Sequence, residues 1–76
     1  MITVKLYGLL RIESGIKEKQ LSAATVQEVL DQLAACAISR KELESCIILI
    51  NGTGAKKRSK LKDGDTVVLM SPVAGG

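Results

Sequence analysis

The sequence predicts an α+β domain in which a β-sheet packs on one main helix. Three observations lead to this fold class: an alternating strand at the start of the chain, an amphipathic helix in the middle, and two continuous apolar runs further on. The 76 residues suffice for a single domain, 1–76, with a thin core. A composition that is 46% hydrophobic and 25% charged is typical of a folded domain rather than a disordered one.

The first predicted element is a strand at the N-terminus. Apolar and more polar residues alternate there, which is the pattern of a strand with one buried face. The apolar positions are Ile2, Val4 and Leu6. Gly8 and Gly15 bracket a predicted turn region, and residues 17–21 are expected to return as the second strand of a hairpin.

The main helix is predicted from a capping pattern followed by helical apolar spacing. Thr25 and Glu28 match a capping box, in which the threonine oxygen accepts from an early backbone N–H and the glutamate reaches back to the cap. One apolar stripe follows, formed by Val26, Val29, Leu30, Leu33, Ala34 and Ala37. Ser39 and Glu42 repeat the capping pattern, so a short extra helical turn is expected after the main helix.

Two apolar runs predict strands with apolar residues on both faces. Residues 47–50 end at the turn signal Asn51-Gly52, and residues 67–70 follow the turn at 63–65. A single helix covers one face of a sheet, so the other face is either an apolar docking patch or is covered by loops and the second helix. The residues leave both alternatives open.

Strand alternation divides the last run into two pairs of side chains. Val67 and Leu69 lie on one face, and Val68 and Met70 lie on the other. The sequence does not decide which pair is exposed. Val68 and Met70 are our candidates for partner binding, and Tyr7, which alternates with the buried positions of its own strand, is a candidate to join them.

Positive charge is concentrated in the last third of the chain. The formal net charge is +3, and the charges of residues 1–50 balance, so the whole excess lies further on. The basic side chains there are Lys56, Lys57, Arg58, Lys60 and Lys62. This segment has no aromatic side chain for base stacking, so a solvated loop or a dock for an acidic protein surface is favoured over nucleic-acid binding. We expect Lys56, Lys57 and Arg58 to steer the chain toward an activating enzyme.

Several kinds of site are excluded or disfavoured by residue usage. The chain has no histidine and no CxxC pair, which argues against the usual zinc sites. It also lacks a Ser-His-Asp or Cys-His pair and a phosphate-binding Gly-x-x-x-x-Gly-Lys-Ser/Thr loop. We therefore expect that the chain binds no cofactor or metal and has no catalytic machinery of its own.

The two cysteines and the apolar runs bear on location. Cys36 falls in the helical pattern and Cys46 precedes a strand, so both are expected to be free core thiols rather than a disulfide. No apolar run approaches the roughly 20 residues of a membrane span, and the N-terminus lacks the apolar region of a signal peptide. A cytoplasmic protein with no membrane or nucleic-acid partner is expected.

The strand pattern breaks at Ser71-Pro72, because proline has no backbone N–H to donate. Residues 72–76 are predicted to be a flexible tail with a reach of at most about 17 Å. Its final glycines, Gly75 and Gly76, have no side chains and can thread a narrow channel of another protein. A small terminus without function is the alternative. A terminal carboxylate is ionised and unreactive at neutral pH, so another enzyme must activate it, most simply as an acyl-adenylate.

Taken together, these segments resemble the MoaD/ThiS family of sulfur carriers, and most closely its molybdopterin synthase small-subunit branch. The resemblance extends from Met1 to Gly76. Its specific parts are Ile50-Asn51-Gly52, Leu61-Lys62-Asp63-Gly64-Asp65, an apolar strand and Pro72-Val73-Ala74-Gly75-Gly76. The fold that it implies is a β-grasp, or ubiquitin-like, mixed sheet on one main helix.

The resemblance also implies a chemistry for the tail. Gly76 would be adenylated with ATP by a ubiquitin-activating-enzyme-like adenylyltransferase and then converted to a thiocarboxylate. Gly75 would be its spacer, and Pro72, Val73 and Ala74 would be inserted into the partner. In the molybdopterin branch, the sulfur passes to a pterin precursor within a complex with a larger synthase subunit.

The same tail chemistry leaves other functions open. Sulfur carriers for the thiazole of thiamine, for tRNA thiolation or for other sulfur metabolism need the same activated glycine, and each would deliver its sulfur to a different accepting enzyme. A ubiquitin-like modifier, joined through that glycine to lysines of target proteins, needs it too. Pro72, four residues before the end, favours the molybdopterin branch over thiazole carriers.

Overall fold

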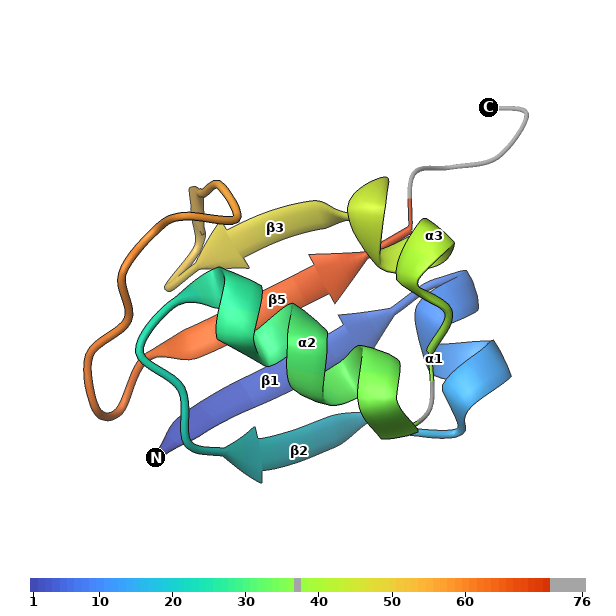
Figure 1. The fold of residues 1–76 in the computed structure, drawn as a ribbon, viewed down its shortest axis with the longest axis horizontal. Coiled ribbons are helices and arrows are strands. Elements are labelled where there is room, and N and C mark those ends of the chain that lie inside the picture. Colours follow the sequence, from blue (N-terminus) through green and yellow to red (C-terminus); the bar gives the residue numbers. More distant parts are fainter. Residues whose placement is uncertain (37, 72–76) are drawn as a thin grey trace.

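A computed structural model describes residues 1–36 and 38–71, in which a five-stranded sheet carries helix α2 across one face (Figure 1). The strands are β1 (Ile2–Tyr7), β2 (Glu18–Leu21), β3 (Ile47–Ile50), β4 (Thr53–Gly54) and β5 (Thr66–Met70). The helices are α1 (Leu9–Ser14), α2 (Val26–Cys36) and α3 (Arg40–Glu44). The predicted α+β class, with one main helix on a sheet, is confirmed.

The sheet is mixed, with strand order β2-β1-β5-β3-β4. β1 pairs antiparallel with β2, as the hairpin predicted, and parallel with β5. β5 in turn pairs antiparallel with β3. Because β1 and β5 are parallel neighbours, their carboxyl ends meet at one edge of the sheet, where Tyr7 pairs with Met70.

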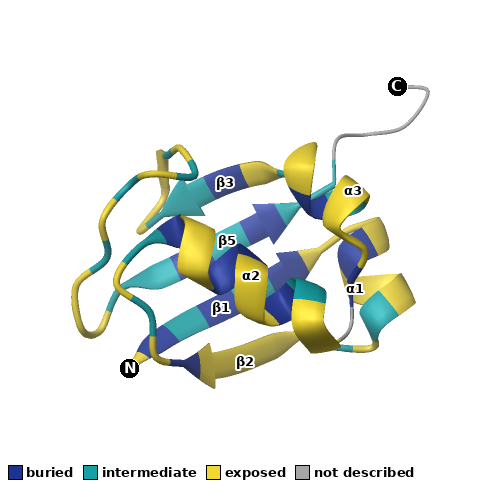
Figure 2. Ribbon diagram, viewed as in Figure 1, coloured by how far each residue is buried: buried dark blue, intermediate teal, exposed yellow. Residues whose placement is uncertain are grey.

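The core lies between the sheet and α2. Buried residues alternate with more exposed ones along β1 and β5, as Figure 2 shows. The inward side chains of these two strands are Ile2, Val4, Leu6, Val67 and Leu69, all at most 2% exposed. On α2, the buried members of the predicted stripe are Val26, Val29, Leu30 and Leu33. Ala34 is half-buried against the core, and Ala37 lies outside the described residues.

Both predicted helix starts carry the expected side-chain caps. The Glu28 N–H donates to Thr25 Oγ1 at 3.3 Å, and the Glu42 N–H donates to Ser39 Oγ at 3.3 Å. The Glu28 carboxylate differs slightly from a standard capping box, because it accepts from the backbone N–H of Ala24, one residue before the threonine, at 3.1 Å. The boxes therefore set where α2 and α3 begin, as the sequence indicated.

Two short elements were absent from the sequence prediction. The segment between Gly8 and Gly15 is helix α1 rather than a turn, although its one buried residue, Leu10, is too little to produce a helical apolar pattern. β4 is a two-residue strand that pairs with β3 across the Asn51-Gly52 turn. Both turn residues have positive φ, 49° and 85°, which explains why asparagine and glycine occupy them.

A hydrogen-bonded network joins the turn after β3 to the start of β5. The Asn51 amide donates to Asp65 at 2.9 Å, and the Asn51 side-chain oxygen accepts from the Thr66 N–H at 3.0 Å. The Lys62 N–H donates to the second Asp65 oxygen at 2.8 Å. These contacts, the Lys62 N–H first, lower the pKa of Asp65 below its ordinary value of 3.8.

The Asp65 network predicts a loss of stability in acid. Because the folded-state pKa of Asp65 is lowered, its stabilising effect is present above pH 3.8 and disappears as the pH falls through the lower folded value. Asp65→Asn should therefore melt at a lower temperature at neutral pH and lose less stability on acidification. Thermal melting across a pH series, with Glu44→Gln as the control carboxylate, measures this. A variant whose acid sensitivity equals that of the wild type would contradict the assignment.

Candidate functional site

The candidate site begins where β5 ends. The predicted tail, Pro72 to Gly76, lies outside the described residues, so Met70 and Ser71 mark its starting point. In Figure 1 this end of β5 lies beside helices α1 and α3, whereas the loop after β4 enters β5 at its other end. We call the segment formed by Met70 and Ser71 the tail root.

The tail root is bonded to the junction between β1 and α1. Ser71 Oγ accepts a hydrogen bond from the Leu9 N–H at 2.9 Å. Gly8, the residue between β1 and α1, has φ 67° and ψ −143° and makes no side-chain cap to α1. The sequence predicts only a turn at Gly8 and indicates no binding role for Ser71 or Leu9. The one available signal was a glycine directly after an alternating strand.

The outer face of the sheet, opposite α2, carries the candidate pair Val68 and Met70. The pairing register places them in line with outward residues of the neighbouring strands. Met70 lies between Tyr7 of β1 and Ile47 of β3, and Val68 lies beside Leu49 of β3. Tyr7 is 42% exposed and Ile47 is 47% exposed. We call these five side chains the outer apolar face.

The structure decides which face of β5 is free. Val67 and Leu69 are 0% exposed beneath α2, whereas Val68 and Met70 are only half-buried. Figure 1 shows α2 across one face of the sheet alone. The outer apolar face directly adjoins the tail root, because Met70 belongs to both.

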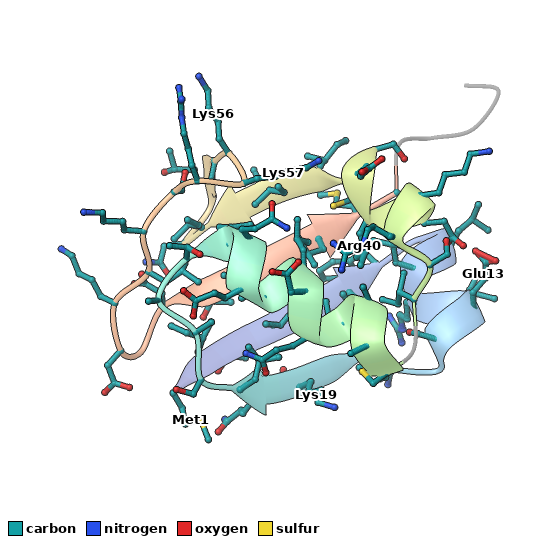
Figure 3. The ribbon with its side chains drawn as sticks, in the orientation of Figure 1. Met1, Glu13, Lys19, Arg40, Lys56 and Lys57 are labelled. Atoms are coloured by element: carbon teal, nitrogen blue, oxygen red, sulfur yellow. The ribbon has the colours of Figure 1, made fainter. Side chains whose placement is uncertain are left out.

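The basic side chains come from a loop that first runs back along β3. Lys56, Lys57 and Arg58 belong to the loop between β4 and β5, which leads into the amino end of β5. The Ala55 N–H, directly before these three residues, donates to the Ile48 carbonyl at 2.9 Å, and Ile48 pairs with Leu69 of β5. Figure 3 shows Lys56 pointing outward from this loop.

The backbone of the basic loop is held against α2. The Lys57 carbonyl accepts from the Gln27 N–H at 2.7 Å, and the Ser59 carbonyl accepts from the Val26 N–H at 3.0 Å. These are N–H groups of the first helical turn, which otherwise lack partners. The loop is therefore anchored through its backbone, and Lys56 is left to act through its charge.

The cysteines differ from each other and from the prediction. Both are free, but Cys36 is exposed rather than a core thiol, because it is the last residue of α2 and stands at the margin of the apolar stripe. Cys46 is half-buried, and its thiol lies 2.9 Å from the Leu43 carbonyl oxygen. Burial raises the pKa of Cys46, so this thiol is protonated at neutral pH and is a weak nucleophile.

No group of three or more His, Cys, Asp or Glu side chains in 1–36 and 38–71 is placed to hold a metal ion. Within the same ranges, no helix has the length and apolar content that crossing a bilayer requires.

The family of the chain follows from a sequence match that includes the tail. The family model described as the ThiS family matches residues 4–76. The chain belongs to the ThiS family. A search of curated proteins gave no match. The predicted resemblance to MoaD/ThiS sulfur carriers is therefore confirmed at the level of the family.

Solved structures place this ThiS-family chain in the ubiquitin-like β-grasp fold. SAMP1 from Haloferax volcanii is 24% identical, with a TM-score of 0.85 over 99% of this chain and 98% of that chain. A chain of the BexX/CysO complex of Amycolatopsis orientalis is 25% identical, with a TM-score of 0.79 and full coverage of both chains, 100% and 100%.

A third structure is a two-subunit complex. A chain of the complex of subunits 1 and 2 of molybdopterin-converting factor from Helicobacter pylori 26695 is 25% identical, with a TM-score of 0.74 over 99% of this chain and 97% of that chain. The ThiS-family chain is thus similar in fold both to a protein named as a modifier and to chains found in complexes with partner proteins.

Proposed function

We propose that this ThiS-family chain is a sulfur carrier whose Gly76 carboxylate is adenylated and then converted to a thiocarboxylate. The observation that carries the proposal is the family match, which continues through the tail to residue 76. The geometry agrees with it, because β5 delivers the chain to an edge of the sheet beside an outer apolar face. The chain itself binds no cofactor in this proposal, and the ATP is used by the activating partner.

The proposed chemistry has two steps. The Gly76 carboxylate attacks the α-phosphorus of ATP within a ubiquitin-activating-enzyme-like adenylyltransferase, and pyrophosphate leaves. A sulfide-level sulfur nucleophile from a donor then attacks the acyl carbon, and AMP leaves with the carbon–oxygen bond electrons. Activation is required because the free carboxylate, with an ordinary pKa near 3.5, is an anion that resists nucleophiles.

We further propose that the sulfur is delivered within a complex with a larger molybdopterin synthase subunit, in the cytoplasm. The similarity to the Helicobacter pylori complex over nearly the whole chain supports this acceptor. In the proposal, Pro72, Val73, Ala74 and Gly75 enter the active site of the partner, and Val68 and Met70 of the outer apolar face contact its surface. An apolar face that adjoins the tail root can be buried while the tail is inserted.

A ubiquitin-like modifier is the second candidate function, and the similarity to SAMP1 favours it. Conjugation to lysines would use the same activated Gly76, so the two functions differ in what accepts the acyl group or its sulfur. Carriers for thiazole, tRNA thiolation or other sulfur metabolism differ from the first proposal only in the acceptor.

Gene deletion in the source organism separates these acceptors. Loss of molybdenum cofactor, restored by the wild-type chain and not by a chain lacking Gly75 and Gly76, is the result expected from the first proposal. Normal molybdenum cofactor combined with loss of thiamine synthesis, of tRNA thiolation or of lysine conjugates would contradict it and would assign the corresponding alternative.

The basic loop predicts a salt-dependent contribution to partner encounter. We propose that Lys56, Lys57 and Arg58, which lie in the loop between β4 and β5, act through their long-range field on an acidic activating enzyme. Reversing all three to Glu should slow association at low salt, and the effect should shrink at physiological salt, where screening acts over about 8 Å.

Stopped-flow association rates with the activating enzyme at several salt concentrations measure this effect. The rate of adenylation at saturating carrier should stay near the wild-type value. Charge reversal at Lys17, Lys19 and Arg11 provides a control with the same change in net charge on other elements. An association rate that is unchanged at low salt would show that the loop is only a solvated surface.

A further inference from the structure

We propose that Ser71, Gly8 and the Leu9 amide form a clasp that fixes the point and direction at which the tail leaves the sheet. The inference rests on the proposed sulfur-carrier function and makes Ser71 a positioning residue for it. All three residues belong to the described part of the chain. They adjoin the last paired residues of β1 and β5, Tyr7 and Met70.

The hydrogen bond of the clasp serves a group that α1 cannot satisfy by itself. The Leu9 N–H belongs to the first turn of the helix, where backbone donors have no acceptor in the helix. Helix caps normally supply a side-chain oxygen at this position, but the cap residue Gly8 has no side chain. Ser71 Oγ supplies the oxygen instead, at 2.9 Å and from 62 residues further along the chain.

Gly8 makes room for this contact. A Cβ atom at position 8 would lie 2.5 Å from Ser71 Oγ, closer than such atoms approach each other. The backbone of Gly8, with φ 67° and ψ −143°, is also in a region that residues with side chains avoid. Both the space and the conformation therefore require glycine where the tail root crosses the start of α1.

The clasp defines the free length of the tail. With Ser71 held to Leu9, the insertable segment starts at Pro72, and its reach is at most about 17 Å. A root that is already ordered loses less conformational entropy when the tail enters a partner than an unrestrained root would lose. The clasp should thus improve the affinity of the carrier for its activating enzyme and leave the chemical step unchanged.

The test compares Ser71→Ala with a matched serine at the other end of α1. Ser14 Oγ donates to the Leu10 carbonyl at 2.6 Å and accepts from the Ile16 N–H at 3.0 Å. ATP–pyrophosphate exchange is measured with the adenylyltransferase of the source organism and the full-length chain. Ser71→Ala should raise the KM for the carrier about threefold to tenfold, the range for one lost hydrogen bond, with kcat within about twofold.

Ser14→Ala should leave the KM unchanged even where it lowers the melting temperature, and Ser71→Thr, which keeps the hydroxyl, should restore the wild-type KM. Gly8→Ala should raise the KM as Ser71→Ala does and should also lower the melting temperature. A merely structural role for Ser71 would lower stability without changing the KM, and that outcome would overturn the proposal.

Amide hydrogen exchange of Leu9, followed by NMR, tests the clasp without any partner enzyme. Exchange at Leu9 should be faster in Ser71→Ala than in the wild type and unchanged in Ser71→Thr. An exchange rate that Ser71→Ala leaves unaltered would overturn the clasp itself. If the wild-type chain supported no ATP–pyrophosphate exchange, the proposed carrier function would fail and the positioning role with it, whatever the Leu9 amide shows.

Discussion

Deleting Gly75 and Gly76, or adding residues after Gly76, should abolish adenylation and leave the fold intact. Deletion shortens the tail and extension lengthens it. In either case the terminal carboxylate no longer lies where the active site of the activating enzyme is expected to receive it. Among the described residues, Leu69 is the last core residue along the chain, so neither change alters a core side chain. Circular dichroism and ATP–pyrophosphate exchange, run on the same samples, measure the two properties.

Lys19→Gln is the control, because it changes an exposed side chain of β2 and leaves the tail and the core unaltered. It should keep most of the exchange activity. An extended chain that was still adenylated at its new terminus would contradict the proposed insertion, and a deletion that unfolded the domain would show that residues 75 and 76 have a structural role.

An Asp placed at two adjacent positions of β5 should have opposite consequences. Leu69 is 0% exposed beneath α2, so Leu69→Asp would place a carboxylate without partners in the core. The cost should consume the roughly 3–5 kcal/mol that a core of this size supplies, and the monomer should unfold. Val68 lies on the outer apolar face, so Val68→Asp should fold with a modest loss of stability.

Partner binding should separate from stability at position 68. A charge that becomes desolvated in an interface should weaken binding by about 30-fold or more, corresponding to a hot-spot loss of 2 kcal/mol. Thermal melting and dissociation constants for the larger subunit and the activating enzyme are measured for Val68→Asp, Met70→Asp and the uncharged control Val68→Thr. If the two outer Asp variants fold and bind like the wild type, the outer apolar face is not a docking surface.

The larger elements could be predicted because their signals are local. The capping pairs at Thr25 and Ser39 and the apolar stripe of α2 depend on residues three or four positions apart, and the structure confirms them. The turn at Asn51-Gly52 is similarly encoded, because both positions adopt positive φ. The order of these strands and helices along the chain then indicated the α+β fold class.

Features that depend on strand register could not be predicted. The alternation in β5 divides Val67 and Leu69 from Val68 and Met70, but only pairing with β1 and β3 and the position of α2 show which pair faces outward. The exposure of Ile47 beside Met70 follows from the same register.

The clasp and α1 were missed for a related reason. Helix α1 buries only Leu10 among its six residues, so its apolar pattern is too weak to distinguish a short helix from a turn. The bond between Ser71 and Leu9 joins positions 62 residues apart, and nothing near either residue in the sequence indicates its partner. The exposure of Cys36 likewise depends on where α2 ends.

Mass spectrometry of the full chain, after incubation with the activating enzyme, ATP and a sulfur donor, tests the central proposal most directly. The account predicts that one oxygen is replaced by one sulfur on the peptide that ends at Gly76. The same product should form when Cys36 and Cys46 are both replaced by alanine, because neither thiol carries the transferred sulfur. Sulfur found as a persulfide on either cysteine with Gly76 unmodified, or a chain that is adenylated but never acquires sulfur, would contradict the account.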